Sequence, residues 1–307
     1  MDENEFDFYR TQSVASDPGG TDVFAGLPAD PRVLAETVRN LLVHREETHL
    51  FGYELPRDRK DAEAETRYAA DILAVARGLC DAPLDRPRRP EERFAGTCRD
   101  FALLLCSALR EKGIPARVRG GYATYFTPGF HDDHWITEYW DADRASWRLV
   151  DAQMAAPELI TAHGIDFDPF DVPRTRFVVA GRAWQDCRSG AADPRTYGVE
   201  LLGLHGWWFV QHNLLLDLAM LNSTELLVWD GWGLADPPMD QPFDALGADE
   251  VALLDTVAEL SAAGGPFTVI RRLPREHEAL RVPPVVSSHT TYLGERTVTL
   301  RQAAALD

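Results

Sequence analysis

The segment that most restricts the fold of this chain runs from Thr97 to Asp151, and its hydrophobic period changes once, at Gly113. Thr97 can cap a helix over residues 98–112, and Gly113 is placed to end it. The apolar positions of this helix follow one another without a break, so we expect it to be buried on most sides. They are Phe101, Ala102, Leu103, Leu104 and Leu105.

After Gly113 the pattern becomes that of strands, over residues 116–126, 134–140 and 146–152. The links between these stretches are short, which predicts an antiparallel meander and not a set of parallel strands. A buried helix packed on such a sheet makes an α+β core. The predicted fold class is therefore α+β.

The flanking sequence divides the chain into three predicted parts. Residues 1–29 hold many acidic, Ser, Gly and Pro residues, and we interpret them as an N-terminal arm whose order depends on docking elsewhere. We expect a core over residues 30–175 and a mainly helical C-terminal extension, residues 176–307, packed on it. Apart from the helix at 98–112, the pattern predicts helices at 31–42, 61–79, 180–187, 203–221 and 248–263.

Composition excludes several classes of function. The formal net charge is −18, from 49 acidic and 31 basic side chains, and such a surface repels phosphate backbones and anionic lipid. We therefore expect neither nucleic acid nor a membrane among the partners. The four cysteines show no CxxC pairing, the N-terminus lacks the pattern of a signal peptide, and no run approaches about 18 apolar residues. These features predict a cytoplasmic protein without a disulfide framework.

Cys98 is the candidate nucleophile because it falls on the first turn of the predicted helix. Backbone N–H groups at that position present partial positive charge, which lowers the pKa of a thiol and can stabilise an oxyanion. Gly96 removes bulk where a substrate chain would have to approach. Cys80, Cys106 and Cys187 are better interpreted as buried, inert cysteines, a role that remains open for Cys98 considered alone.

Two residues of the predicted sheet can complete a triad with Cys98. His134 opens one strand and Asp151 ends the next, so antiparallel pairing would bring these two residues close together. The imidazole can then pair with the thiolate while the carboxylate fixes the other ring nitrogen. His131 is a competing base, but we interpret its surroundings, FHDD, as a turn that holds a ring less firmly than a strand does.

The stretch GTCRDFALLLCSALREKGIPARVRGGYATYF, followed by DHWITEYWDADRASWRLVDAQ, resembles the transglutaminase-like family, a branch of the papain-like thiol enzymes. That family has G-x-C at a helix start, a GIPAR turn, an HxW.E strand and a W.lvD strand. The order Cys, His, Asp and the intervals of 36 and 17 residues fit this pattern over about residues 60–155. The resemblance implies a papain/transglutaminase-like core, with Cys98 as nucleophile, His134 as general base and acid, and Asp151 as orienting residue. The C-terminal part resembles the extension of a group of bacterial transglutaminase-like proteins.

This resemblance implies acyl transfer through a thioester on Cys98. The acyl donor would be an amide, ester or thioester, in a peptide, a small molecule or a carrier-bound group, and the acceptor an amine. With water as acceptor, the chain would be a cysteine protease or amidase. A catalytically inactive binding or scaffold protein on the same fold is the alternative from another class.

No metal and no cofactor is expected. The sequence has no loop with the spacing of a calcium site, and His205 and His212, seven residues apart, have no evident third ligand.

Three more residues are candidates for substrate binding. Arg99 follows the nucleophile, although an ion pair with Asp100 or a role at the helix start is favoured over a substrate contact. Trp135 follows the predicted base. Gln153 follows Asp151 by two residues, and a solvated loop fits it as well.

The second donor of the oxyanion hole is not identified by sequence. Animal transglutaminases have a tryptophan upstream of the nucleophile for this purpose, whereas the first tryptophan here is Trp135. Tyr53, His49 or a backbone amide of residues 88–97 could supply the donor.

Overall fold

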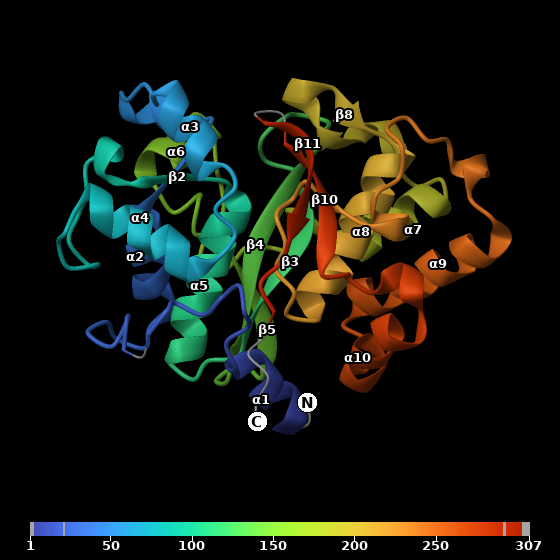
Figure 1. Cartoon of the computed structure of the whole chain (residues 1–307), viewed down its shortest axis with the longest axis horizontal. Coiled ribbons are helices and arrows are strands. Elements are labelled where there is room, and N and C mark those ends of the chain that lie inside the picture. Colours follow the sequence, from blue (N-terminus) through green and yellow to red (C-terminus); the bar gives the residue numbers. More distant parts are fainter. Residues whose placement is uncertain (1–2, 21, 291–292, 303–307) are drawn as a thin grey trace. The chain divides into compact units, whose positions relative to one another are not determined.

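The computed structural model divides the chain into two compact units (Figure 1). Unit 1 consists of Met1–Val118 and Ile136–Pro173, and unit 2 of Arg119–Trp135 and Arg174–Asp307. The structure describes residues 3–20, 22–290 and 293–302.

Unit 1 contains most of the predicted core and the N-terminal arm. Its helices and 3-10 turns are α1 (Glu3–Arg10), α2 (Pro31–Leu41), η1 (Thr48–Phe51), α3 (Arg57–Glu63), α4 (Ala69–Leu79), η2 (Pro90–Glu92), α5 (Cys98–Glu111) and α6 (Pro157–Ala162). Its strands are β1 (Leu42–His44), β2 (Phe94–Gly96) and β5 (Ser146–Val150). Strands β3 (Ala116–Ala123) and β4 (His131–Asp141) belong to both units, because the boundary falls inside each of them.

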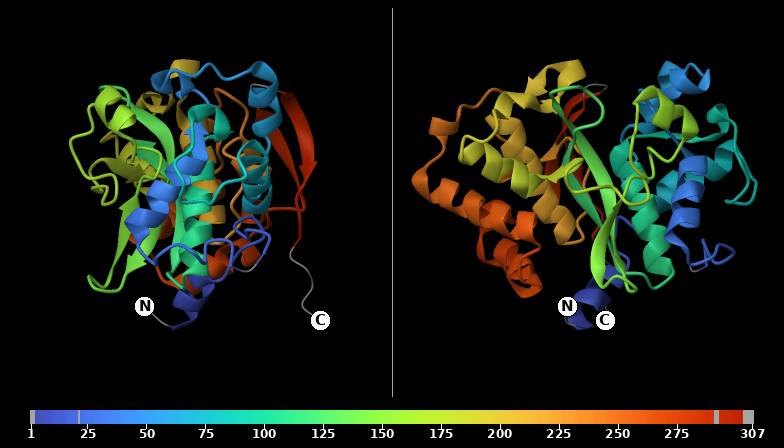
Figure 2. Two further views of the ribbon diagram at one scale, coloured as in Figure 1. Left: turned by 90° about the vertical axis from the view of Figure 1, so that its left-hand side faces the viewer. Right: turned by 180° about the vertical axis from the view of Figure 1, so that it is seen from behind.

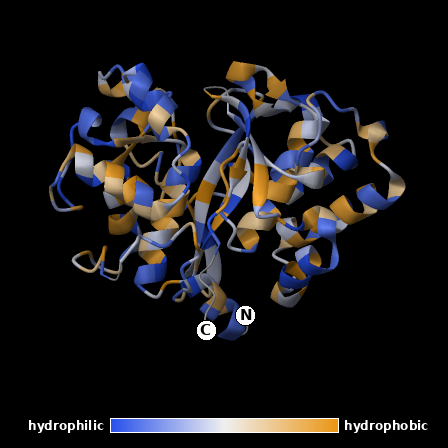
Figure 3. Cartoon of the chain, viewed as in Figure 1, coloured by the Kyte–Doolittle hydropathy of each residue, from blue (hydrophilic) through white to orange (hydrophobic). Residues whose placement is uncertain are grey.

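Helices α2 and α5 begin where the sequence predicts. The Asp30 carboxylate accepts the Arg32 N–H at 2.8 Å and caps α2, on which hydrophobic residues recur (Figure 3). At the start of α5 the Thr97 N–H donates to Asp100 Oδ2 at 2.8 Å. Gly113 follows the end of α5 with a φ of 74°, the left-handed conformation that glycine adopts without strain.

Helix α5 packs on the strands of unit 1 and is buried from Cys98 through Arg110. The Thr137 hydroxyl of β4 donates to the Ala102 carbonyl at 3.0 Å. Strand β5 pairs antiparallel with β4, from Thr137 opposite Val150 to Asp141 opposite Ser146. The predicted α+β class, with α5 buried against the sheet, is confirmed, but the sheet is mixed and not wholly antiparallel, because β4 pairs parallel with β7 (Tyr197–Val199).

The N-terminal arm is folded against α5 and β5 within unit 1. Tyr9 is fully buried, with its ring edge-on to Trp147 at 5.5 Å. The Gln12 amide donates to the Ser107 carbonyl at 2.8 Å, and Glu111 accepts the Phe24 N–H at 2.7 Å. These contacts extend along α5 and give the arm an ordered path.

One helix predicted over residues 61–79 is instead two, α3 and α4, separated by residues 64–68. The break coincides with two tertiary hydrogen bonds, one of which uses a backbone N–H that a continuous helix would bond internally. The Glu63 carboxylate accepts a hydrogen bond from the Ala95 N–H, and the Ala69 N–H donates to the Ala15 carbonyl at 2.8 Å. Contacts with distant segments have overridden local helix propensity here.

Unit 2 combines helices with short strands. Its helices and 3-10 turns are α7 (Ala180–Arg188), η3 (Pro194–Thr196), η4 (Glu200–Leu202), α8 (Trp207–Leu221), η5 (Gly233–Ala235), η6 (Phe243–Ala245), α9 (Ala248–Ala263), α10 (Phe267–Glu276) and η7 (Glu278–Leu280). Its remaining strands are β6 (Phe177–Val179), β7 (Tyr197–Val199), β8 (Leu204–His205), β9 (Asp230–Gly231), β10 (Val285–Thr290) and β11 (Gly294–Thr299). Strands β10 and β11 form a hairpin (Figure 2).

The sheet that contains β3 and β4 has the strand order β6-β3-β4-β7-β8, with β5 paired to β4. Helices α7 and α9 match the predicted ones, whereas α8 begins later than predicted because residues 204–205 pair with β7. In the part of the chain that the structure describes, no helix is long and apolar enough to span a membrane.

A buried ionic network joins β3, α8 and α9 within unit 2. Arg119 donates two hydrogen bonds of 3.0 Å to the Asp217 carboxylate, one to each oxygen. The same carboxylate accepts the Gly120 N–H at 2.8 Å and the Ser261 hydroxyl at 2.6 Å. Asp217 is completely buried, so its charge is stabilised by these donors alone among the described contacts.

Replacing Asp217 by Asn should destabilise the chain by about 3–5 kcal/mol, because it leaves the buried Arg119 charge without its carboxylate. Urea unfolding followed by circular dichroism measures the loss. Asp193→Asn, in the exposed pair of Asp193 with Arg195, is the matched control and should barely move the midpoint. Equal effects of the two substitutions would contradict a stabilising role for the buried network.

Candidate active site

Cys98 is the first residue of α5 and is 8% exposed. Its backbone therefore lies in the turn where the helix presents N–H groups and partial positive charge. Among the described residues no cysteine forms a disulfide.

The structure explains why residue 96 is a glycine. A Cβ at this position would lie 2.9 Å from Asp100 Oδ2 and 3.2 Å from the Phe94 ring. The space next to Gly96 is thus filled by the carboxylate that accepts the Thr97 N–H. The expectation that this glycine clears a path for substrate is wrong.

The other cysteines lie in different environments. Burial raises the pKa of Cys187 to about 12, with further contributions from Asp186 and Asp193, so its thiol is protonated at neutral pH. Cys106 is completely buried in α5, and Cys80 is partly exposed at the end of α4. Neither of these two lies on the first turn of a helix.

His134 lies on β4 and is 2% exposed. Three aromatic rings of unit 2 meet its imidazole edge-on, with centroid distances of 5.9 Å for Tyr125, 5.0 Å for Phe126 and 6.4 Å for Phe177. These contacts restrict the ring to few orientations and exclude water from its faces.

The residues on either side of His134 point to the opposite face of β4, as strand geometry requires. Trp135 is 1% exposed and covers Gly120 so closely that a Cβ there would lie 2.5 Å from the indole. Asp133 accepts the Trp135 indole N–H at 3.1 Å and the Asn213 amide of α8 at 2.6 Å. Trp135, a candidate substrate contact, is thus engaged in packing and in this hydrogen bond.

His131, the competing base, is the first residue of β4 and not part of a turn. Its ring stacks on Tyr197 with a centroid distance of 4.1 Å and an interplanar angle of 8°. Burial lowers the pKa of His131. It lies three residues from His134, and side chains separated by three positions face opposite sides of a strand.

Asp151 directly follows β5 and is 1% exposed. Its N–H donates to the Pro169 carbonyl at 2.8 Å, and its Oδ1 accepts the Met154 N–H at 3.1 Å. The carboxylate therefore belongs to a tight turn over residues 151–154. Cys98 and Asp151 are both in unit 1, and His134 belongs to unit 2, two residues before the boundary inside β4.

The two remaining candidates for substrate binding are buried in unit 1. Arg99 is completely buried and forms an ion pair with Asp100 at 3.2 Å. Gln153 is 3% exposed, and its amide donates to Glu47 at 2.8 Å. Glu47 itself has no recognisable signal in the sequence, because the two residues that hydrogen-bond to it, Gln153 and His163, are more than 100 positions away along the chain.

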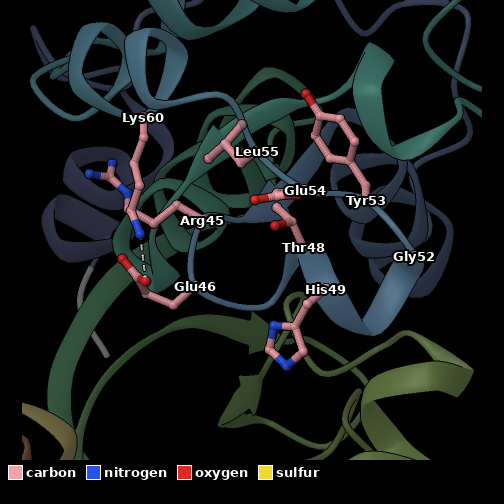
Figure 4. Close-up of a pocket in the computed structure, with 9 residues that line it drawn as sticks. All are labelled: Arg45, Glu46, Thr48, His49, Gly52, Tyr53, Glu54, Leu55 and Lys60. Carbon is pink, nitrogen blue, oxygen red and sulfur yellow. Dashed lines mark hydrogen bonds and ion pairs between the residues drawn. The ribbon is translucent and has the colours of Figure 1, made fainter.

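An open pocket of about 560 Å³ lies between the segment after β1 and the start of α3 (Figure 4). It is lined by Arg45, Glu46, Thr48, His49, Gly52, Tyr53, Glu54, Leu55 and Lys60. Both of its walls are hydrogen-bonded to β2, through the Arg45 N–H to the Gly96 carbonyl and through the Ala95 N–H to Glu63. Strand β2 ends two residues before Cys98, so the walls of the pocket are bonded to the segment that leads into this candidate nucleophile.

Figure 4 shows Lys60 and Glu46 meeting on one side of this pocket, with a distance of 2.7 Å between Nζ and Oε2. His49 and Tyr53, two of the suggested oxyanion donors, are both in the lining. The volume is in the range of pockets that bind small molecules. Among the described residues no group of three or more His, Cys, Asp or Glu side chains is arranged as metal ligands.

The Asp133 carboxyl beside His134 should make stability depend on pH. Burial raises the pKa of Asp133 to about 7, although hydrogen bonds from Asn213 and Trp135 oppose this shift. Between about pH 4 and pH 7 the folded chain then holds a proton that the unfolded chain releases, so this residue lowers stability as pH rises.

Asp133→Asn should raise stability by only about 1–2 kcal/mol at pH 5, where most of the penalty of Asp133 has yet to develop, since Asn keeps the acceptor for both hydrogen bonds. At pH 8 the variant should be more stable than the wild type by up to about 4 kcal/mol. Urea unfolding of both proteins at the two pH values measures this difference. A difference independent of pH would show that the carboxyl ionises normally.

Comparison with known proteins places part of this chain in a family. Residues 62–152, the span that contains Cys98, His134 and Asp151, match the model of the transglutaminase-like superfamily. A comparison with curated proteins finds no match. A solved structure of a candidate cysteine protease from Cytophaga hutchinsonii is similar over 58% of this chain and 46% of that chain, at 17% identity and a TM-score of 0.25. The chain thus covers less than half of that protein. The family match thus shows that the segment over residues 62–152 is similar to the transglutaminase-like superfamily.

Proposed function

We propose that this chain is a cysteine enzyme that transfers an acyl group through a thioester on Cys98, with His134 and Asp151 completing the triad. The observation that carries the proposal is the position of Cys98, at the first residue of a capped and buried helix inside the segment that matches the family. A thiol at such a position is activated by the backbone itself.

In the proposed reaction the Cys98 thiolate attacks the carbonyl carbon of an amide, ester or thioester, and the thiol proton passes to His134. The tetrahedral intermediate collapses as His134 gives this proton to the leaving group, which leaves a thioester on Cys98. A second nucleophile then loses a proton to His134 and attacks the thioester carbonyl. The C–S bond breaks, the Cys98 thiolate takes the proton back from His134, and the acylated acceptor leaves.

Strand geometry supports the role of Asp151. This residue follows Val150, the partner of Thr137 on β4, and His134 lies three residues before Thr137 on the same strand. An Asp on the strand next to a catalytic His can hold the imidazole in the tautomer that accepts the thiol proton. The aromatic rings around His134 support a fixed ring orientation as well.

We propose an amine as the acyl acceptor, in a peptide, a small molecule or a carrier-bound group, and water in the protease or amidase alternative. The pocket beside β2 is the proposed site for one of the two substrates, because its walls are bonded to the strand that leads into Cys98. The net charge of −18 favours neutral or cationic substrates over polyanions such as nucleic acid or anionic lipid.

Intact-mass spectrometry after incubation with a panel of acyl donors tests the function. Each donor is supplied with and without a primary amine, to the wild type, to Cys98→Ala and to Cys80→Ala as the control for a partly exposed thiol. We expect an acyl adduct on the wild type and on Cys80→Ala but not on Cys98→Ala, discharged faster when amine is present.

Equal discharge with and without amine would identify a hydrolase. A Cys98 that forms no adduct with any donor and reacts with iodoacetamide no faster than the other cysteines would contradict the enzyme and favour a binding or scaffold protein.

Asp151→Asn should lower the acylation rate by about 10²–10⁴-fold, since Asn no longer selects the required tautomer of His134. The turn should persist, because the Asn carbonyl can still accept the Met154 N–H. Circular dichroism checks the fold, and stopped-flow or quenched-flow mass measurements give the rate. A rate within about 2-fold of the wild type would remove Asp151 from the mechanism.

A further inference from the structure

Glu47 joins three segments of unit 1 that are distant in sequence. It lies between β1 and η1, and its side chain is 13% exposed. Its Oε1 lies 2.8 Å from His163 Nε2, at the end of α6, and its Oε2 lies 2.8 Å from Gln153 Nε2. His44 Nδ1 lies 3.8 Å from the same Oε2. One carboxylate therefore holds the β1–η1 segment, the 151–154 turn and the end of α6 together.

The contact with Gln153 acts within the turn that carries Asp151. Gln153 lies between Asp151 and Met154, whose backbone N–H donates to Asp151 Oδ1 at 3.1 Å. A carboxylate only accepts hydrogen bonds, so Glu47 fixes which end of the Gln153 amide faces it. Gln153 is 3% exposed and cannot exchange this partner for water without opening the turn.

The other end of the Glu47 segment is bonded to the strand that leads into Cys98. The Glu47 N–H donates to the His44 carbonyl, and the Arg45 N–H donates to the Gly96 carbonyl, each at 2.9 Å. His44 and Gly96 are paired residues of the parallel strands β1 and β2. A continuous set of hydrogen bonds thus runs from the residue two positions before Cys98 to the residue two positions after Asp151.

The carboxylate of Glu47 is ionised at neutral pH. Burial acts to raise the pKa of Glu47, but the hydrogen bond from His163 and the charges of His44 and His163 outweigh it and lower the pKa overall. Hydrogen bonds to an ionised acceptor are shorter and stronger than neutral ones. This clamp is therefore stiffer than one made by an amide.

We propose that Glu47 is a positioning residue of the Cys98 site, which holds the turn carrying Asp151 against the strand pair that leads into the nucleophile. The inference rests on the proposed function in one respect, that Asp151 takes part in the reaction. Glu47 acts through Asp151 and does not touch the reacting atoms. Its removal should impair the orientation of the triad and leave the binding of the acyl donor almost unaffected.

Glu47→Gln is the informative substitution because it changes the shape of the side chain very little. Gln offers one neutral carbonyl oxygen where Glu offers two charged ones, so both contacts lose their ionised acceptor and only one of Gln153 and His163 can still face an oxygen. We expect kcat for acylation to fall about 10-fold, with KM within about 2-fold of the wild type. This pattern is typical of residues that orient a catalytic group without contacting the substrate.

A double-mutant cycle with Asp151→Asn separates positioning from simple destabilisation. If Glu47 acts through Asp151, Glu47→Gln should slow acylation by less than about 2-fold in the Asp151→Asn background. The control is Glu111→Gln, which weakens the contact of the N-terminal arm with α5 at Phe24 and has no link to Asp151. Its effect should be the same in both backgrounds.

Hydrogen exchange supplies a second readout that needs no substrate. Glu47→Gln should speed exchange of the Met154 amide, which is bonded to Asp151, and leave the Thr97 amide unchanged. Additive effects in the cycle, or unchanged exchange at Met154, would overturn the positioning role while the proposed function stands. A wild type without any acyl adduct would overturn the function, and a Met154 amide that still responds would then identify Glu47 as a structural clamp alone.

Discussion

The start of α5 depends on one buried hydrogen bond, from the Thr97 N–H to the Asp100 carboxylate. This bond fixes the first turn of the helix, and the first turn fixes Cys98. The carboxylate fits only because the residue before Thr97 is a glycine, since any side chain at Gly96 would overlap it. The neighbouring Arg99 is buried with its charge on Asp100, so the acid is held from both sides. The G-T-C sequence is thus explained by packing around a capping acid, which in turn fixes the position of Cys98.

Strand β4 fixes the position of His134 through packing on both of its faces. Successive side chains point to opposite sides of the strand, so His134 lies on one face and its two neighbours lie on the other. On one side Asp133 and Trp135 are locked by Asn213 and by the space over Gly120. On the other side the rings of Tyr125 and Phe126 contact the His134 imidazole edge-on and limit its orientation. The backbone of β4 cannot rotate His134 away without breaking the packing of its two neighbours.

Sequence predicted those parts of the structure whose causes are local. The capped start of α2 at Asp30, the limits of α5 and the three strands that follow it depend on neighbouring residues, and all were predicted. What failed depends on distant contacts. The break between α3 and α4 reflects hydrogen bonds to Ala15 and Ala95, and the role of Gly96 reflects a carboxylate four positions later whose orientation no pattern specifies. Glu47 could not be predicted for the same reason, because no pattern in the neighbouring sequence indicates a residue that binds both Gln153 and His163.

Acidic side chains in unit 1 surround the segment that leads into Cys98. Nearby carboxylates add to the effect of burial in raising the pKa of a thiol, as Asp186 and Asp193 do for Cys187 even though Arg182 and Arg195 pair with them. Three acids around the segment that leads into Cys98 have partners of their own. Arg59 binds Glu63 at 2.6 Å, Lys60 binds Glu46 at 2.7 Å, and His163 and Gln153 bind Glu47. These partners offset the charges of the acids locally, and the first turn of α5 adds its own partial positive charge, whereas the net charge of −18 acts mainly on substrates approaching from solution.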